Sequence, residues 1–71
     1  MKKILVLGGG GFIGSHLVKK LREEENNFVK AVDLKKPSFS LSQAQEFLVG
    51  DLRSQSFCDK VFNQTYDEIY Q

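Results

Sequence analysis

The glycines between positions 8 and 14, in the run GGGGFIG, are the residues with the clearest chemical meaning. They fit two overlapping registers, Gly9-x-Gly11-x-x-Gly14 and Gly8-x-x-Gly11-x-x-Gly14. Such a turn needs glycine because the chain bends tightly after a strand, its backbone touches a pyrophosphate, and the next helix packs closely on the strand. The N–H groups and the positive dipole end of that helix then attract the phosphates. These residues predict a dinucleotide site.

A carboxylate stands where such a site would need one. Asp33 ends the apolar run Phe28 to Val32, roughly 20 residues after the last glycine, where an acid accepts hydrogen bonds from the adenosine ribose. A solvated carboxylate at a strand end would have the same sequence, but the flanking elements favour the ribose role. A 2′-phosphate would be repelled by Asp33, so we expect NAD rather than NADP. Lys35 and Lys36 are interpreted as a solvated loop pair.

The elements that would position these residues alternate between strands and helices. Apolar runs, helical periodicity and turn residues predict strands at 3–7, 28–33, 46–49 and 68–71, and helices at 12–24 and from residue 55 onward. This alternation predicts an α/β protein, the N-terminal half of a Rossmann-type doubly wound parallel sheet that is incomplete after its fourth strand begins.

Apolar side chains at helical spacing predict which faces of the two helices are buried. Ser54 is the expected N-cap of the second helix, and Cys58 is expected to be a small buried residue. Residues 34–45 predict an irregular connection marked by Pro37 and several serines, Ser38 and Ser40 among them, with a weak helical turn near 42–45. The expected core positions are Ile13, Leu17, Val18 and Leu21 on the first helix and Phe57, Cys58, Val61 and Phe62 on the second.

Composition excludes several other classes of protein. The chain has 71 residues, 41% hydrophobic and 27% charged, with a net charge of +1, which gives no electrostatic argument for nucleic acid or an anionic membrane. Its one cysteine allows no internal disulfide and indicates no metal site. The N-terminal apolar run is too short for a signal peptide and no run is long enough to span a membrane, so we expect a cytoplasmic protein.

Several of these residues together resemble a known family. From Gly8 to Leu17 the chain is similar to the Gly-x-x-Gly-Phe-Ile-Gly-Ser-His-Leu opening of extended short-chain dehydrogenase/reductases, the nucleotide-sugar epimerases and dehydratases. Asp51-Leu52 resembles the Asp-Leu that contacts adenine in that group. A finer resemblance, from 33–36, 46–47, 51–53 and 66–71, is to GDP-mannose 3,5-epimerase-type members. The resemblance implies NAD as cofactor, bound by Gly8, Gly11, Phe12, Ile13, Gly14, Asp33, Asp51 and Leu52.

The resemblance also implies a mechanism. In this family NAD takes a hydride from a sugar carbon, the keto-sugar changes configuration or loses water, and the hydride returns. A Tyr-x-x-x-Lys pair supplies the base, and neither Tyr66 nor Tyr70 forms one, so we expect both to be packing residues. Residues 1–71 are therefore expected to be a partial NAD-binding domain, with the catalytic and nucleotide-sugar-binding portions elsewhere in a parent homodimer.

Other interpretations of the same residues fit the sequence less well. A P-loop needs lysine where Ser15 stands, and the continuation after Phe12 favours the reductase group over a flavoprotein. A non-catalytic module that binds or senses a dinucleotide remains an alternative to the enzyme. His16 is interpreted as a bracing residue, and Arg53 could pair with Asp51 or reach the ligand.

Overall fold

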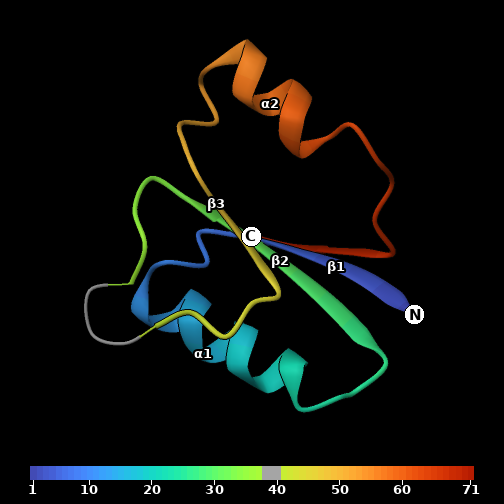
Figure 1. Cartoon of the computed structure of the whole chain (residues 1–71). Coiled ribbons are helices and arrows are strands. Elements are labelled where there is room, and N and C mark those ends of the chain that lie inside the picture. The colour runs from blue at the N-terminus through green and yellow to red at the C-terminus, as the bar shows by residue number, and fades with distance from the viewer. Residues whose placement is uncertain (38–40) are drawn as a thin grey trace.

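A single parallel sheet forms the centre of the molecule (Figure 1). The structure, a computed structural model, describes residues 1–37 and 41–71. Its strands β1 (Lys2–Leu7), β2 (Asn27–Asp33), β3 (Glu46–Val49) and β4 (Glu68–Tyr70) are arranged in the order β3-β2-β1-β4, with helices α1 (Phe12–Arg22) and α2 (Gln55–Val61). The predicted α/β class and parallel sheet are confirmed, and every predicted strand lies within one residue of its expected start and end.

The order of the strands determines where a ligand can bind. β1 is central: Leu5 pairs with Lys30 of β2 on one side and with Ile69 of β4 on the other. The chain moves outward from β1 to β2 and β3, and then returns through α2 to the opposite side of β1. In doubly wound sheets, ligands bind at the carboxyl ends of the strands where the strand order reverses. Here that point lies between β1 and β4.

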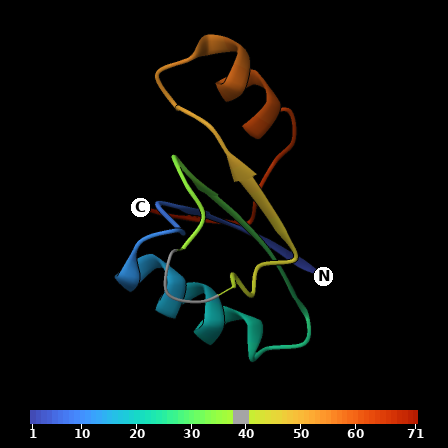
Figure 2. The same ribbon diagram turned by 60° about the vertical axis from the view of Figure 1, so that its left-hand side comes forward.

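The two helices cover opposite faces of the sheet (Figures 1 and 2). Successive side chains of a strand point to opposite faces, so a strand that is apolar at consecutive positions can contribute to two cores. The core on the α1 face contains Ile4, Val6, Val18, Val29 and Ala31, and the core on the α2 face contains Leu5, Val32 and Val61.

The predicted core face of α1 is correct except at its first turn. Val18 is buried, and Leu17 and Leu21 pack against the same cluster. The prediction was wrong for Ile13, whose side chain is 83% exposed. The first turn of α1 directly follows the glycine loop at the carboxyl edge of the sheet, so its side chains have little sheet to pack against.

The predicted face of α2 is correct at its centre and wrong at two positions. Ser54 caps the helix as expected, accepting a hydrogen bond from Phe57 N, and Val61 is fully buried. Phe62 is 47% exposed because it follows the last helical residue and its backbone (φ −102°, ψ 27°) leaves the helical path. Cys58 is half-buried rather than buried.

The connection between β2 and β3 is irregular where it is described, and residues 42–45 form no helical turn. Gln45, just before β3, instead binds to β2: its backbone N–H donates to Val29 O at 3.0 Å, and its side-chain oxygen accepts from Val29 N at 2.7 Å. Arg22 Nε also donates to Gln43 O at 2.8 Å. These contacts tie the segment to β2 and α1. The expectations for Ser38 and Ser40 lie outside the described residues.

Candidate functional site

The glycine loop after β1 forms a tight turn whose conformation depends on glycine. Gly8 has a φ of +82°, a left-handed conformation that other residues rarely adopt. The N–H groups of Gly8 and Gly9 both donate to Val32 O, at 2.8 and 3.2 Å, which ties the loop to β2. A Cβ atom on Gly14 would lie 2.1 Å from Gly8 O, so only glycine allows α1 to start this close to the loop.

Gly11 differs from its neighbours in what surrounds it. A Cβ atom on Gly9 would lie 2.6 Å from Ala31 Cβ, and one on Gly10 would lie 2.2 Å from Lys35 O. Apart from its two chain neighbours, the only atom among the described residues within 4 Å of a Cβ on Gly11 is Gly8 O, at 3.6 Å. The chain itself therefore does not require glycine at position 11. Open space in front of an exposed glycine backbone fits the close approach of a ligand.

The N-terminus of α1 is electrostatically suited to an anion. Gly11 is the N-cap residue and offers no side-chain acceptor, and the first turn contains no acidic residue. The partial positive charge of the helix end is thus left without a side-chain counter-charge in that turn. Ser15 Oγ donates to Gly9 O at 3.1 Å, and His16 Nδ1 lies within hydrogen-bond distance of Phe12 O, at 2.9 Å. These bonds brace the turn, the role expected for His16.

Asp33 lies at the carboxyl end of β2, beside the glycine loop. Its Oδ2 accepts a hydrogen bond from Gly10 N at 2.8 Å, and its Oδ1 accepts one from Leu34 N at 2.6 Å. The carboxylate is therefore fixed in orientation by two backbone donors. Each carboxylate oxygen can accept more than one hydrogen bond, so hydroxyl groups of a ligand could still bind it.

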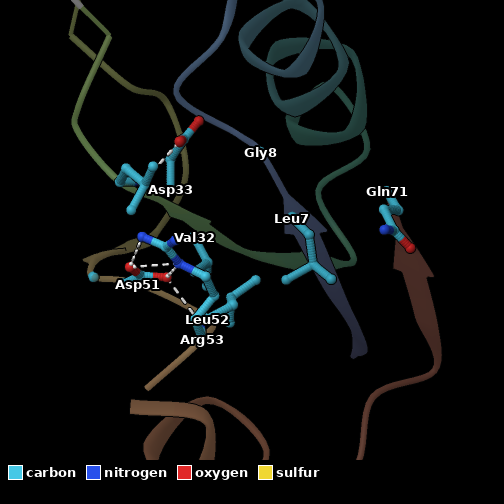
Figure 3. A pocket seen from close by; sticks show the side chains of 10 residues that line it. Leu7, Gly8, Val32, Asp33, Asp51, Leu52, Arg53 and Gln71 are labelled. Atoms are coloured by element: carbon cyan, nitrogen blue, oxygen red, sulfur yellow. Dashed lines mark hydrogen bonds and ion pairs between the residues drawn. The ribbon is translucent and has the colours of Figure 1, made fainter. Parts of the chain in front are cut away.

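A cleft of about 400 Å³ opens at the carboxyl ends of all four strands (Figure 3). It brings together Gly8, Asp33, Asp51 and Leu52 from the predicted site. Gly11, Phe12, Ile13 and Gly14 do not line it and lie on the adjoining loop and first turn of α1. The complete lining comprises Leu7, Gly8, Val32, Asp33, Leu34, Gly50, Asp51, Leu52, Arg53 and Gln71.

Some lining residues were not predicted as site residues, although the sequence held a signal for two of them. Leu7 and Gln71 lie at the carboxyl end of β1 and directly after β4, and the rule for parallel sheets places a ligand at such ends. Gly50 has a packing role, because a Cβ atom there would lie 2.3 Å from the Phe57 ring of α2. That contact depends on the tertiary structure.

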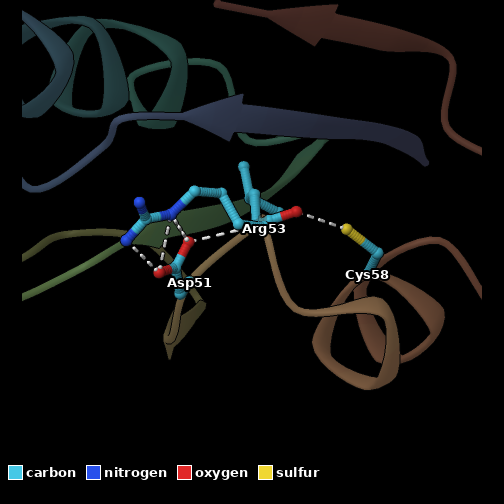
Figure 4. Close-up of polar contacts among 4 residues, drawn as sticks. Asp51, Arg53 and Cys58 are labelled. Carbon is cyan, nitrogen blue, oxygen red and sulfur yellow. Dashed lines mark hydrogen bonds and ion pairs between the residues drawn. The ribbon is translucent and has the colours of Figure 1, made fainter.

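The segment after β3 is held in shape by its own side chains (Figure 4). Arg53 binds Asp51 through Nε, at 3.1 Å from each carboxylate oxygen, and through Nη2, at 2.8 Å from Oδ2. Arg53 therefore pairs with Asp51, the first of the two roles left open above. The Cys58 thiol donates to Leu52 O at 2.8 Å, which joins α2 to the lining of the cleft. Hydrogen bonds from Arg53 lower the pKa of the Asp51 carboxyl.

Arg53→Ala is expected to raise the pKa of Asp51 toward its ordinary value, because the guanidinium that stabilises the carboxylate is lost. In the native protein the lowered pKa contributes stability above the unfolded-state pKa, and this contribution is lost as the pH falls through the folded pKa. The contribution is small because the pair is exposed to solvent. NMR titration of the Asp51 carboxyl carbon measures the shift, and an unchanged pKa would contradict the pairing.

The two tyrosines make packing contacts, as expected. Tyr66 packs against the core on the α2 face and its hydroxyl donates to Val61 O. Tyr70 packs against the core on the α1 face and donates to Glu68 Oε1 at 2.9 Å.

In residues 1–37 and 41–71 no helix has the length and apolarity to cross a membrane. The same residues contain no group of three His, Cys, Asp or Glu side chains that could hold a metal ion.

Comparison with known families identifies the family to which this chain belongs. Residues 4–71 match the family model described as the NAD dependent epimerase/dehydratase family. The chain belongs to this family. The resemblance seen from Gly8 to Leu17 and at Asp51-Leu52 is thereby confirmed at the level of the family.

The relatives that this chain matches are named for different nucleotide sugars. The chain is 39% identical to a UDP-glucose 4-epimerase of Streptococcus mutans over 90% of its own length and 20% of that protein. It is 38% identical to GDP-mannose 3,5-epimerase 1 of Oryza sativa over 96% of its length and 18% of that protein. A crystal structure of a UDP-glucose 4-epimerase superimposes with a TM-score of 0.78 at 37% identity, covering 96% of this chain and 21% of the other. Because the sequence identities to these relatives are similar, they do not favour one nucleotide sugar over another.

Proposed function

We propose that this chain is the NAD-binding part of a nucleotide-sugar epimerase or dehydratase that acts by transient hydride transfer to the bound cofactor. The chain spans about a fifth of the length of its relatives (20% of the Streptococcus mutans epimerase), so residues 1–71 correspond to part of a cofactor domain. The substrate, the catalytic residues and the proposed cytoplasmic homodimer belong to the full-length protein. Family membership supports the reaction class, because the relatives named above are epimerases of nucleotide sugars.

One observation carries the NAD assignment: a glycine backbone with open space at Gly11 lies beside an oriented carboxylate, Asp33, at the carboxyl edge of the sheet. The loop and the start of α1 would hold the pyrophosphate, and Asp33 would accept hydrogen bonds from the ribose hydroxyls. Leu34 and Leu52 present 65% and 37% of their surface and would contact the adenine. Asp51 lines the same cleft, and its carboxylate would have to exchange part of its hydrogen bonding to Arg53 to accept from the adenine edge.

The residues present fit NAD, which would supply a reversible hydride acceptor when bound. The role of this chain is to bind the cofactor and to fix its orientation against the substrate. Asp33 also provides selectivity, because a 2′-phosphate at the ribose would meet a carboxylate that already accepts two backbone hydrogen bonds. Neither Lys35 nor Lys36 lines the cleft.

The cofactor assignment predicts that the full-length protein binds NAD more tightly than NADP and that Asp33→Ala narrows the difference. Loss of hydrogen bonds to a charged acceptor should weaken NAD binding by about 10- to 100-fold. NADP binding should weaken less or improve, because the repulsion is also removed. Titration calorimetry of both cofactors measures this, with Lys35→Ala as a charge-changing control in the same loop. Equal or tighter binding of NADP by the unmodified protein would contradict the assignment.

The reaction class is tested separately from cofactor binding. When a nucleotide sugar is mixed with the NAD-loaded full-length protein, transient formation of NADH absorbance is expected. NAD binding without any reduction by UDP- or GDP-sugars would support a dinucleotide-sensing module instead of an enzyme.

A further inference from the structure

Asp33 connects all three segments that surround the adenosine side of the cleft. Its Oδ2 accepts from Gly10 N of the loop after β1, at 2.8 Å, and its Oδ1 accepts from Leu34 N of the loop after β2, at 2.6 Å. Its backbone carbonyl accepts from Gly50 N, which begins the segment after β3, at 3.0 Å. These bonds form within the protein alone. A residue that served only to meet a ribose would not need the bond to Gly10.

We propose that Asp33 is also a positioning residue that holds the glycine loop in the shape required for the pyrophosphate. This inference rests on the proposed function, because it assigns a second task within the same NAD site. The loop consists of consecutive glycines, which lose much conformational freedom when ordered and have no side chains to anchor them. A hydrogen bond to a carboxylate is stronger than one to a neutral acceptor and can offset part of that cost. Gly10 N directly precedes Gly11, the residue with open space for the phosphates.

The positioning role and the ribose role predict different effects on a ligand that lacks ribose hydroxyls. If Asp33 acts through the hydroxyls alone, its removal does not weaken the binding of such a ligand. Loss of a negative charge near phosphates would by itself strengthen the binding. If Asp33 holds the loop, removal of its acceptor weakens the binding of the phosphates even without hydroxyls. Weaker binding of this ligand after the removal of Asp33 would therefore indicate the positioning role, whereas stronger binding would indicate the electrostatic effect.

The experiment uses the full-length protein with two probes, ADP and 2′,3′-dideoxy-ADP, measured by calorimetry. Asp33→Asn and Asp33→Leu are matched in size and charge, but only asparagine keeps an oxygen that can accept from Gly10 N. We expect 2′,3′-dideoxy-ADP to bind about fivefold more weakly to Asp33→Leu than to Asp33→Asn, as for the loss of one hydrogen bond. Asp33→Ala gives a second comparison of the same kind if the leucine variant folds poorly. Equal affinities of the acceptor-lacking and asparagine variants would overturn the proposal.

A second measurement needs no ligand. Hydrogen exchange of the loop peptide that contains Gly10 should be faster in Asp33→Leu than in Asp33→Asn and the unmodified protein, and equal exchange would overturn the proposal. The two proposals also fail in distinguishable ways. If the unmodified protein binds neither ADP nor NAD, the proposed function and this inference both fall. If it prefers ADP to the dideoxy analogue but the variants bind the analogue equally, the NAD site stands and the positioning role falls.

Discussion

Replacement of Gly11 by valine is expected to abolish NAD binding while the full-length protein stays folded. The backbone at Gly11 (φ −78°, ψ 171°) is extended and accessible to a β-branched residue, and a Cβ atom would meet only Gly8 O at 3.6 Å among the described residues. Position 11 therefore does not need glycine for its backbone conformation, although backbone conformation is one reason for glycine in such motifs. The isopropyl group would instead occupy the space that the pyrophosphate needs.

The expected loss of NAD affinity is at least about 100-fold, because displaced phosphates forfeit several hydrogen bonds to charged oxygens. Calorimetry measures the affinity, and a thermal melt checks that the fold is retained. Gly11→Ala is the graded control: its single methyl group fills less of the space and should cause a smaller loss. Unchanged NAD affinity in a folded Gly11→Val protein would show that this turn is not the phosphate site.

Replacement of Gly14 by alanine, three residues further on, is expected to destabilise the fold itself. The new Cβ atom would lie 2.1 Å from Gly8 O, 2.9 Å from Gly8 C and 3.0 Å from Gly9 Cα. All three are backbone atoms, so no change of rotamer relieves the overlap, and either α1 or the glycine loop must shift. Overpacking of this kind typically costs up to about 3 kcal/mol in the free energy of unfolding.

Denaturant titration of the full-length protein measures the effect of Gly14→Ala, with Gly11→Ala as a matched control that adds the same methyl group nearby. The unfolding midpoint should fall for Gly14→Ala and stay close to that of the unmodified protein for Gly11→Ala. Equal stabilities of the two variants would contradict the close contact between α1 and the loop. The pair separates two functions of one motif, since Gly14 permits packing and Gly11 permits approach of a ligand.

The sequence by itself determined the order and type of the elements and the chemistry of the loop. Short apolar runs bounded by turn residues predict buried parallel strands, and the strand from Glu46 to Val49 has the predicted bounds in the structure. The glycine spacing and the position of Asp33 follow from local geometry and chain direction, so the carboxyl edge of the sheet could be predicted as the site. These features depend on neighbours in sequence or on a general rule of topology.

The tertiary structure alone decided which members of each pattern face the core and which contacts complete the site. Helical periodicity placed Ile13 on the same stripe as Val18, but periodicity contains no information on where the sheet beneath a helix ends, so Ile13 is exposed. The bond from Gly10 N to Asp33 joins residues 23 positions apart, and Arg53 could be assigned to Asp51 only from its side-chain direction. Such contacts form because β1, β2 and β3 lie side by side and bring the loops after their carboxyl ends within hydrogen-bond distance of one another.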